Sequence, residues 1–194
     1  VSVARQTYLE AVRTPYVTIL DADDEWIPGR AERIIKALDS GADIYTEPID
    51  LYDGPTNKFL RTMSAPEFLK KEKTPARLFE RNYLPGDTQV GAKVATFKKA
   101  GGYDIGLFGS EGYDLLLRAV MGGAQFAYGE ASGYKMYAYP GSLSRQLEKM
   151  RAMTAKVLQK HNYESVRARC LQSGHSERVA AWVLTSMALY RYEP

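Results

Sequence analysis

Three aspartates lie within four positions of one another, directly after an apolar run. They are Asp21, Asp23 and Asp24 in the stretch YVTILDADDEWIP, residues 16–28. A single aspartate in such a place is typical of a helix cap or a turn. Three neighbouring carboxylates repel one another unless a cation lies among them. Because Mg²⁺ and Mn²⁺ bind carboxylate oxygens, the cluster predicts a divalent-metal site in which the cation bridges to substrate phosphates.

The residues on either side predict the elements that hold this cluster. Residues 16–20 are apolar and mostly β-branched, which is typical of a central strand buried on both faces. Pro28 suits the first turn of a helix, and apolar positions recur at helical spacing within residues 30–38 before Gly41. The cluster is therefore predicted in a strand-to-helix loop. In α/β proteins, ligands bind at this end of the strands.

The rest of the chain alternates between strand-like and helix-like segments. Strands are predicted at residues 43–51 and 58–63, as a hairpin or as neighbours, and at 89–97, 125–128 and 134–139. Helices are predicted at residues 3–13, 98–100, 111–121, 143–162 and 176–192. This order predicts an α/β sandwich with a mostly parallel central sheet and a C-terminal helical tail. We expect one domain over residues 1–145 and a helical extension over residues 146–194.

The composition narrows the setting. The 194 residues include one cysteine, Cys170, which excludes an internal disulfide and fits a reducing compartment. The net charge is +3 without a dense run of Lys or Arg, so we expect no nucleic-acid partner. No apolar stretch reaches the ~18 residues of a membrane span, which favours a cytoplasmic protein. Because the chain begins at Val1 rather than Met, we expect it to be a segment of something longer.

Two classes of enzyme place Asp-x-Asp at the end of a buried strand. Phosphatases of the haloacid dehalogenase type follow the pair with Thr or Val, where this chain has Glu25. Their Ser/Thr and Lys partners are not evident downstream either. The neighbouring residues therefore disfavour this class.

The second class fits two stretches of the sequence. ARQTYLEAVRTPYVTILDADDEWIPGRAERIIKAL resembles the family 2 glycosyltransferases of GT-A fold, which carry Ala-Arg-Asn, a short helix and then Leu-Asp-x-Asp-Asp. VATFKKAGGYDIGLFGSEGYDLLLRAVMGGAQFAYGEASGYKMYAYPGSLSR resembles the second half of the same family, with its Gly-Gly-Phe-Asp-Glu, acidic pair and Asp-Leu-x-x-Arg. The resemblance covers residues 3–145 and keeps both motifs in order.

The resemblance implies that a nucleotide-diphosphate sugar is the donor and that Mn²⁺ or Mg²⁺ is the cofactor. Asp21 and Asp23 match the Asp-x-Asp element that binds the ribose and diphosphate, and Asp23 and Asp24 are the implied metal ligands. Arg5 matches the Arg of Ala-Arg-Asn and is expected at the nucleotide. Arg145 follows the last strand, where a loop can fold over the diphosphate.

The acceptor side of the resemblance contains a departure. Glu111 matches the first member of the acidic pair near the acceptor hydroxyl, whereas Gly112 replaces the second, the usual general base of inverting members. Glu111 or Asp114 must then act as base towards the hydroxyl of a carbohydrate or another acceptor. Asp114 has a simpler alternative, as a first-turn residue that stabilises the helix dipole.

Two further readings stay open. The strand, helix and strand with which family members open have no room before Val3, and Gly112 lacks a carboxylate. The alternative function is therefore a catalytically inactive, glycosyltransferase-like binding or scaffolding module.

For the last helix, core packing is the simpler interpretation, and peripheral membrane or homo-oligomer contact is the alternative. His161 and His175 are predicted to be solvated.

Overall fold

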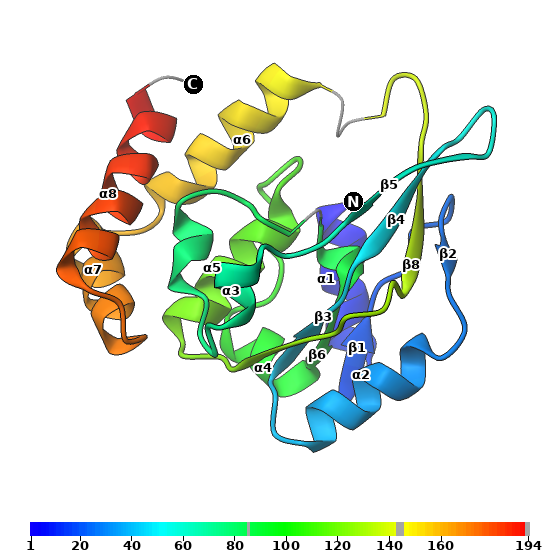
Figure 1. The fold of residues 1–194 in the computed structure, drawn as a ribbon, viewed down its shortest axis with the longest axis horizontal. Coiled ribbons are helices and arrows are strands. Elements are labelled where there is room, and N and C mark those ends of the chain that lie inside the picture. Colours follow the sequence, from blue (N-terminus) through cyan, green and yellow to red (C-terminus); the bar gives the residue numbers. More distant parts are fainter. Residues whose placement is uncertain (85, 143–145, 193–194) are drawn as a thin grey trace.

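Short strands form two four-stranded sheets in the computed structural model, which describes residues 1–84, 86–142 and 146–192 (Figure 1). The first sheet has the order β1 (Tyr16–Thr18), β6 (Val90–Lys93), β3 (Ile44–Thr46) and β7 (Phe126–Tyr128). The second has the order β2 (Glu25–Trp26), β8 (Tyr134–Ala138), β4 (Ile49–Asp53) and β5 (Lys58–Met63). Figure 1 shows the second sheet on one side of the molecule and the C-terminal helices on the other.

Both sheets are mixed, so the prediction of a mostly parallel sheet is wrong. β6 runs antiparallel to β1 and β3, and β4 runs antiparallel to β5; β3–β7 and β4–β8 are parallel pairs. The predicted strand at residues 43–51 divides at Glu47 and Pro48, where the chain passes from one sheet to the other. Proline lacks the N–H that a ladder needs. Alternating strands and helices indicate parallel pairing only when each connection returns to the same sheet.

β1 lies at an edge of the first sheet in the described residues, where it pairs with β6. The sequence pattern instead favoured a central position. Val17 is buried in the same core cluster as Leu9 of α1 (Ser2–Ala11), while Tyr16 and Thr18 are half-buried. An apolar, β-branched run therefore reports the burial of a strand but not the number of its neighbours.

The helix α5 (Glu111–Met121) is buried along almost its whole length, from Glu111 to Val120. Its bounds match the predicted helix. Around it pack α4 (Val94–Lys99), the 3₁₀ turns η1 (Ala76–Phe79) and η2 (Asp87–Gln89), and α6 (Leu147–Gln159). The predicted strand at residues 89–97 therefore ends at Lys93, because α4 begins earlier than expected. Two further helices, α2 (Arg30–Asp39) and α3 (Glu67–Lys70), follow β2 and β5.

The C-terminal part contains one helix that the sequence analysis did not predict. Beyond α6, α7 (Tyr163–Gln172) precedes α8 (Glu177–Tyr192). Asn162 begins α7, since its side chain accepts hydrogen bonds from the backbone N–H groups of Glu164 and Ser165, a typical N-cap. The buried apolar residues of these three helices, such as Leu158, belong to the same cluster as those of α5. No helix of the described residues has the length and apolar character needed to cross a membrane.

The two histidines are not solvated, contrary to the sequence reading. The ring of His161 is buried edge-on against Phe79, with ring centroids 4.9 Å apart. The Nε2 atom of His175 lies 3.0 Å from Oε2 of Glu72. Burial lowers the pKa of His161 to about 4, so this ring is neutral in the folded protein at pH 7. Charged neighbours in the sequence did not indicate exposure here, because His161 packs against the buried Phe79 and His175 lies beside the buried Glu72.

His161 makes stability fall in mild acid. The pKa of His161 is about 4 in the folded chain, against about 6.5 for an unperturbed histidine, so protons bind the unfolded state first as the pH falls. Between pH 6.5 and pH 4 the wild type should lose on the order of 2 kcal/mol more unfolding free energy than His161→Leu. Urea unfolding at a series of pH values measures this difference. A difference between the two proteins that does not change with pH would contradict the assignment.

Candidate functional site

The acidic cluster lies in the loop between β1 and α2, as the sequence predicts. The backbone N–H of Asp24 donates to the carbonyl of Asp21 over 3.1 Å and closes a turn. The two residues of β2 follow, and Gly29 then adopts a left-handed conformation with φ 83° before α2 begins. A glycine suits this position because a side chain makes positive φ costly.

Two tyrosines of β8 hold this loop. The backbone N–H of Tyr137 donates to Oδ1 of Asp24 over 2.9 Å, and the backbone N–H of Asp21 donates to the Tyr134 hydroxyl over 3.1 Å. Burial raises the pKa of Asp24, while hydrogen bonds from Tyr137 and Tyr134 counteract that rise. The loop is therefore fixed to the second sheet through Asp24 and the backbone of Asp21.

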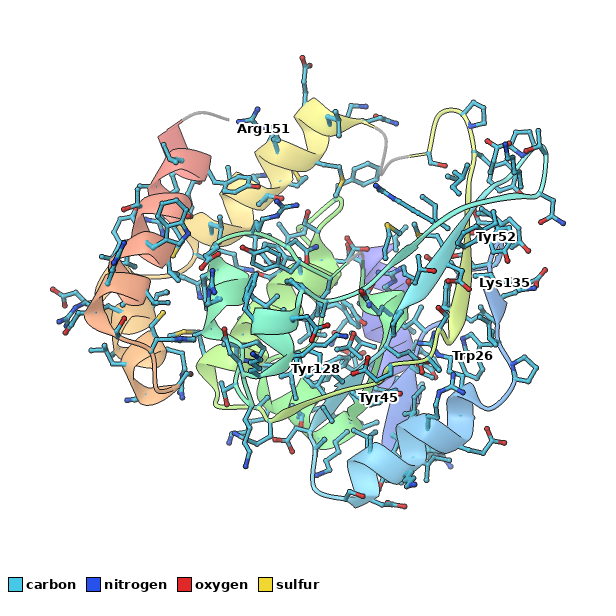
Figure 2. All side chains as sticks on the ribbon, viewed as in Figure 1. Trp26, Tyr45, Tyr52, Tyr128, Lys135 and Arg151 are labelled. Atoms are coloured by element: carbon cyan, nitrogen blue, oxygen red, sulfur yellow. The ribbon has the colours of Figure 1, made fainter. Side chains whose placement is uncertain are left out.

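A buried arginine supports Tyr134 from behind. The Arg30 guanidinium is 1% exposed and lies over the Tyr134 ring, 4.9 Å from its centroid, and over Trp26 at 5.4 Å. Figure 2 shows Trp26 at the end of β2 nearest to α2. Arg30 Nη2 also donates to the Thr88 carbonyl, and Nε lies 3.6 Å from Glu47 Oε1. This cation joins both sheets beneath the acidic loop.

Arg5 of α1 binds three carboxylates from three other segments. Its Nη1 lies 2.6 Å from Oδ1 and 2.8 Å from Oδ2 of Asp87, and 3.2 Å from Oε1 of Glu111. Its Nη2 lies 3.1 Å from Oδ1 of Asp21. Burial alone would lower the pKa of Arg5. The negative charges of Asp87, Asp21 and Glu111 outweigh this effect, so the pKa is raised. The guanidinium therefore stays charged and links the acidic loop to the beginning of α5.

A cavity of about 390 Å³ opens beside this arginine. It brings together Arg5, Asp21, Asp23, Asp24 and Glu111 of the residues predicted from the sequence. The other lining residues come mainly from the segment before β6, the beginning of α5 and β8: Asn82, Gly86, Asp87, Thr88, Gly109, Ser110, Gly112, Tyr113, Met136, Tyr137, Ser142 and Met150. Arg145 lies outside the described residues.

Asp114 is placed away from this cavity. Its side chain is fully buried, and its two oxygens lie 2.6 Å from Arg118 Nη2 and 2.6 Å from Lys160 Nζ. Lys160 follows α6 and also binds Asp104. The structure thus uses Asp114 to attach the C-terminal helices to α5. Glu111, by contrast, lines the cavity and keeps Oε1 against Arg5.

Asp87 is the charged lining residue that the sequence analysis did not predict. It is 6% exposed, and Tyr103 donates its hydroxyl to Oδ2 over 3.0 Å. Burial raises the pKa of Asp87, and Arg5 counteracts that rise. The only local signal is an acid after Pro-Gly in LPGD, which equally indicates a turn.

The acidic loop offers part of a coordination sphere for a divalent cation. Among the described residues, no group of three His, Cys, Asp or Glu side chains is arranged to hold a metal by itself. Mg²⁺ is commonly bound by one or two carboxylates and completed by substrate phosphates and water. Asp23 and Asp24, both at the cavity, fit that donor set.

Comparison with known families decides the class of this protein. The sequence model described as Glycosyl transferase family 2 matches residues 1–98, about half of the chain. The chain belongs to this family. The matched residues include Arg5, the acidic loop and Asp87. No curated protein matches the chain.

Solved structures of TarS from S. aureus share the fold of this family 2 chain. TarS 1-349 in complex with UDP-GlcNAc has a TM-score of 0.64 and 13% identity, over 96% of this chain and 51% of that one. TarS 1-349 in complex with UDP has a TM-score of 0.61 and 14% identity, over 98% and 51%. A longer TarS structure has a TM-score of 0.60 and 14% identity, over 97% and 30%. The fold is thus GT-A-like, and the chain spans about half the length of TarS 1-349.

The contacts of Arg5 predict a large loss of stability when it is removed. Arg5→Met leaves the buried Asp87 carboxylate without its main cation, which should cost about 2 to 4 kcal/mol of unfolding free energy. Arg13→Met is the control, because Arg13 is exposed just beyond α1. Urea unfolding compares the two variants.

The pH dependence of that loss tests its cause. The unpaired Asp87 of Arg5→Met should take up a proton more readily, so the loss should be smaller at about pH 5 than at about pH 8. Equal losses in Arg5→Met and Arg13→Met would contradict the role of the three carboxylates.

Proposed function

We propose that this chain forms the catalytic site of a transferase that moves a sugar from a nucleotide-diphosphate sugar to an acceptor hydroxyl with inversion. The observation that carries the proposal is the single cavity that gathers Asp23, Asp24, Arg5 and Glu111. Membership of family 2 supports the reaction class. UDP-GlcNAc is the first donor to test, because the similar TarS fold binds it.

The charge of the cavity supports a metal-bound donor. Five carboxylates and one guanidinium line it, so a bare diphosphate would be repelled. Mn²⁺ or Mg²⁺ held by Asp23 and Asp24 would neutralise charge on the diphosphate leaving group. Asp21, which also lines the cavity, is the residue proposed to contact the ribose. Arg5 already binds three carboxylates, and its place at the cavity allows contact with the nucleotide as well.

Glu111 is the proposed general base. Its Oε1 accepts from Arg5, and no described residue donates to Oε2, which leaves that oxygen for the acceptor hydroxyl. The hydroxyl oxygen attacks the anomeric carbon as the bond to the diphosphate breaks, and its proton passes to Oε2 of Glu111. Attack on the face opposite the diphosphate inverts the anomeric centre. Asp114 has no part in this step, because both of its oxygens bind cations elsewhere.

Donor binding tests the metal ligands. Isothermal titration of the protein with UDP-GlcNAc should show binding that requires Mn²⁺, and Asp23→Asn should weaken it by at least about tenfold, since a ligand carboxylate is lost. Glu32→Gln is the control, because it removes one exposed negative charge from the nearby α2. Binding without Mn²⁺, or an equal weakening in both variants, would disprove the metal-bridged site. Other nucleotide-diphosphate sugars extend the panel if UDP-GlcNAc does not bind.

Glu111→Gln separates transfer from donor binding. The amide keeps an oxygen for Arg5 but cannot take a proton, so kcat should fall by roughly 10²- to 10⁴-fold while the donor Kd stays within about threefold. Glu164→Gln, in the exposed first turn of α7, should leave both unchanged. Release of the nucleoside diphosphate measures turnover. Full activity in Glu111→Gln would exclude Glu111 as the base, and donor binding without any turnover in the wild type would favour the binding-module alternative.

A further inference from the structure

Gly112 lies directly against the carboxylate of Asp87. A Cβ atom built on Gly112 would lie 2.4 Å from Cγ, 2.5 Å from Cβ and 2.8 Å from Oδ1 of Asp87. These distances are shorter than any van der Waals contact, so the two side chains cannot be present together without rearrangement. Gly112 is not among the glycines with positive φ, so its backbone does not require glycine. The residue that requires it is Asp87.

Asp87 is held in this place by two other residues. Arg5 contacts both of its carboxylate oxygens, and the Tyr103 hydroxyl donates to Oδ2. Tyr103 itself is 5% exposed. The carboxylate therefore has a fixed position at the wall of the cavity, next to the first turn of α5.

We propose that Asp87 provides, from the segment before β6, the second carboxylate that the sequence lacks at position 112, and that it is the positioning residue for Glu111. The inference rests on the proposed function. Both oxygens of Asp87 are occupied by donors, so it does not take the acceptor proton. It holds Arg5 so that Nη1 reaches Glu111 and Nη2 reaches Asp21. It also offsets the positive charge of Arg5 beside the base.

The proposal explains why the glycine at position 112 does not leave the site one carboxylate short. Asp87 and Gly112 are separated by 25 positions in the sequence but occupy adjoining space. An aspartate in one of these positions requires the absence of a side chain in the other. The two residues should therefore act as a pair, and moving the carboxylate from one to the other is the decisive experiment.

The test moves the carboxylate. Asp87→Gly and Gly112→Asp are made singly and together; glycine is needed at 87 because the Asp87 Cβ would itself collide with a new side chain. Each single variant should lose at least about tenfold in kcat. Asp87→Gly removes the carboxylate, and the new side chain of Gly112→Asp collides with Asp87. The double variant should recover at least about tenfold over both singles. Gly112→Asp combined with Asp53→Gly, at the half-buried end of β4, is the control and should recover nothing.

Asp87→Asn provides the readout that a purely structural role would not move. It keeps the shape of the side chain, so the donor Kd should stay within about threefold, while kcat falls and the acid limb of its pH profile moves to lower pH as the negative charge beside the base is lost. An unchanged kcat and profile in Asp87→Asn would overturn the proposal. So would a double variant no more active than Asp87→Gly.

Stability distinguishes this inference from the proposed function. Urea unfolding of the same variants should show coupling between positions 87 and 112, with the double variant more stable than the sum of the single losses predicts. If the wild type transfers no sugar but the coupling is present, the proposed function fails. The conclusion that Asp87 occupies the space beside Gly112 is then still supported. If the wild type is active and neither activity nor stability is coupled, the inference fails alone.

Discussion

The bridge from Arg5 to three carboxylates is the interaction on which the candidate site depends. It joins α1, the acidic loop after β1, the segment before β6 and the first residue of α5. A guanidinium suits this role because it offers five donors in a rigid plane and keeps its charge. Removing water from such a network is costly, so it adds little to net stability, but breaking it leaves buried charge unpaired. The network therefore determines the relative positions of Asp21, Asp87 and Glu111 closely.

The acidic loop is fixed from its other side by the second sheet. β8 donates a backbone N–H to Asp24, and Tyr134 accepts from the backbone of Asp21. The buried Arg30 lies against the Tyr134 ring. It also donates a hydrogen bond to the carbonyl of Thr88, which lies just before β6 of the first sheet. The loop is thus held between two sheets, and the carboxylate of Asp23 is the member of the cluster with no hydrogen-bond partner among the described residues. This arrangement concentrates negative charge at the place proposed for the cation.

Apart from Met150 of α6, which lines the cavity, the C-terminal helices contribute to the site indirectly. Lys160 binds Asp114, one turn after Glu111 in α5, and the apolar residues of α6, α7 and α8 join the core around that helix. A general base must be held in a precise place to act, because catalysis depends on its distance from the reacting hydroxyl. Asp114, predicted as a candidate base, instead helps to provide that rigidity.

The sequence alone identified the acidic cluster, the loop that holds it, the helix at residues 111–121 and the family, because these depend on residue types and periodicities within short windows. The tertiary structure decided the strand directions, the edge position of β1, the partners of Asp114 and the place of Asp87 beside Gly112. Each of these depends on contacts between residues far apart in the chain. Lys160 and Asp114 are 46 positions apart, and Arg5 and Glu111 are 106 apart. No local pattern encodes such a pairing, because it arises only when packing of the whole core brings the two segments together.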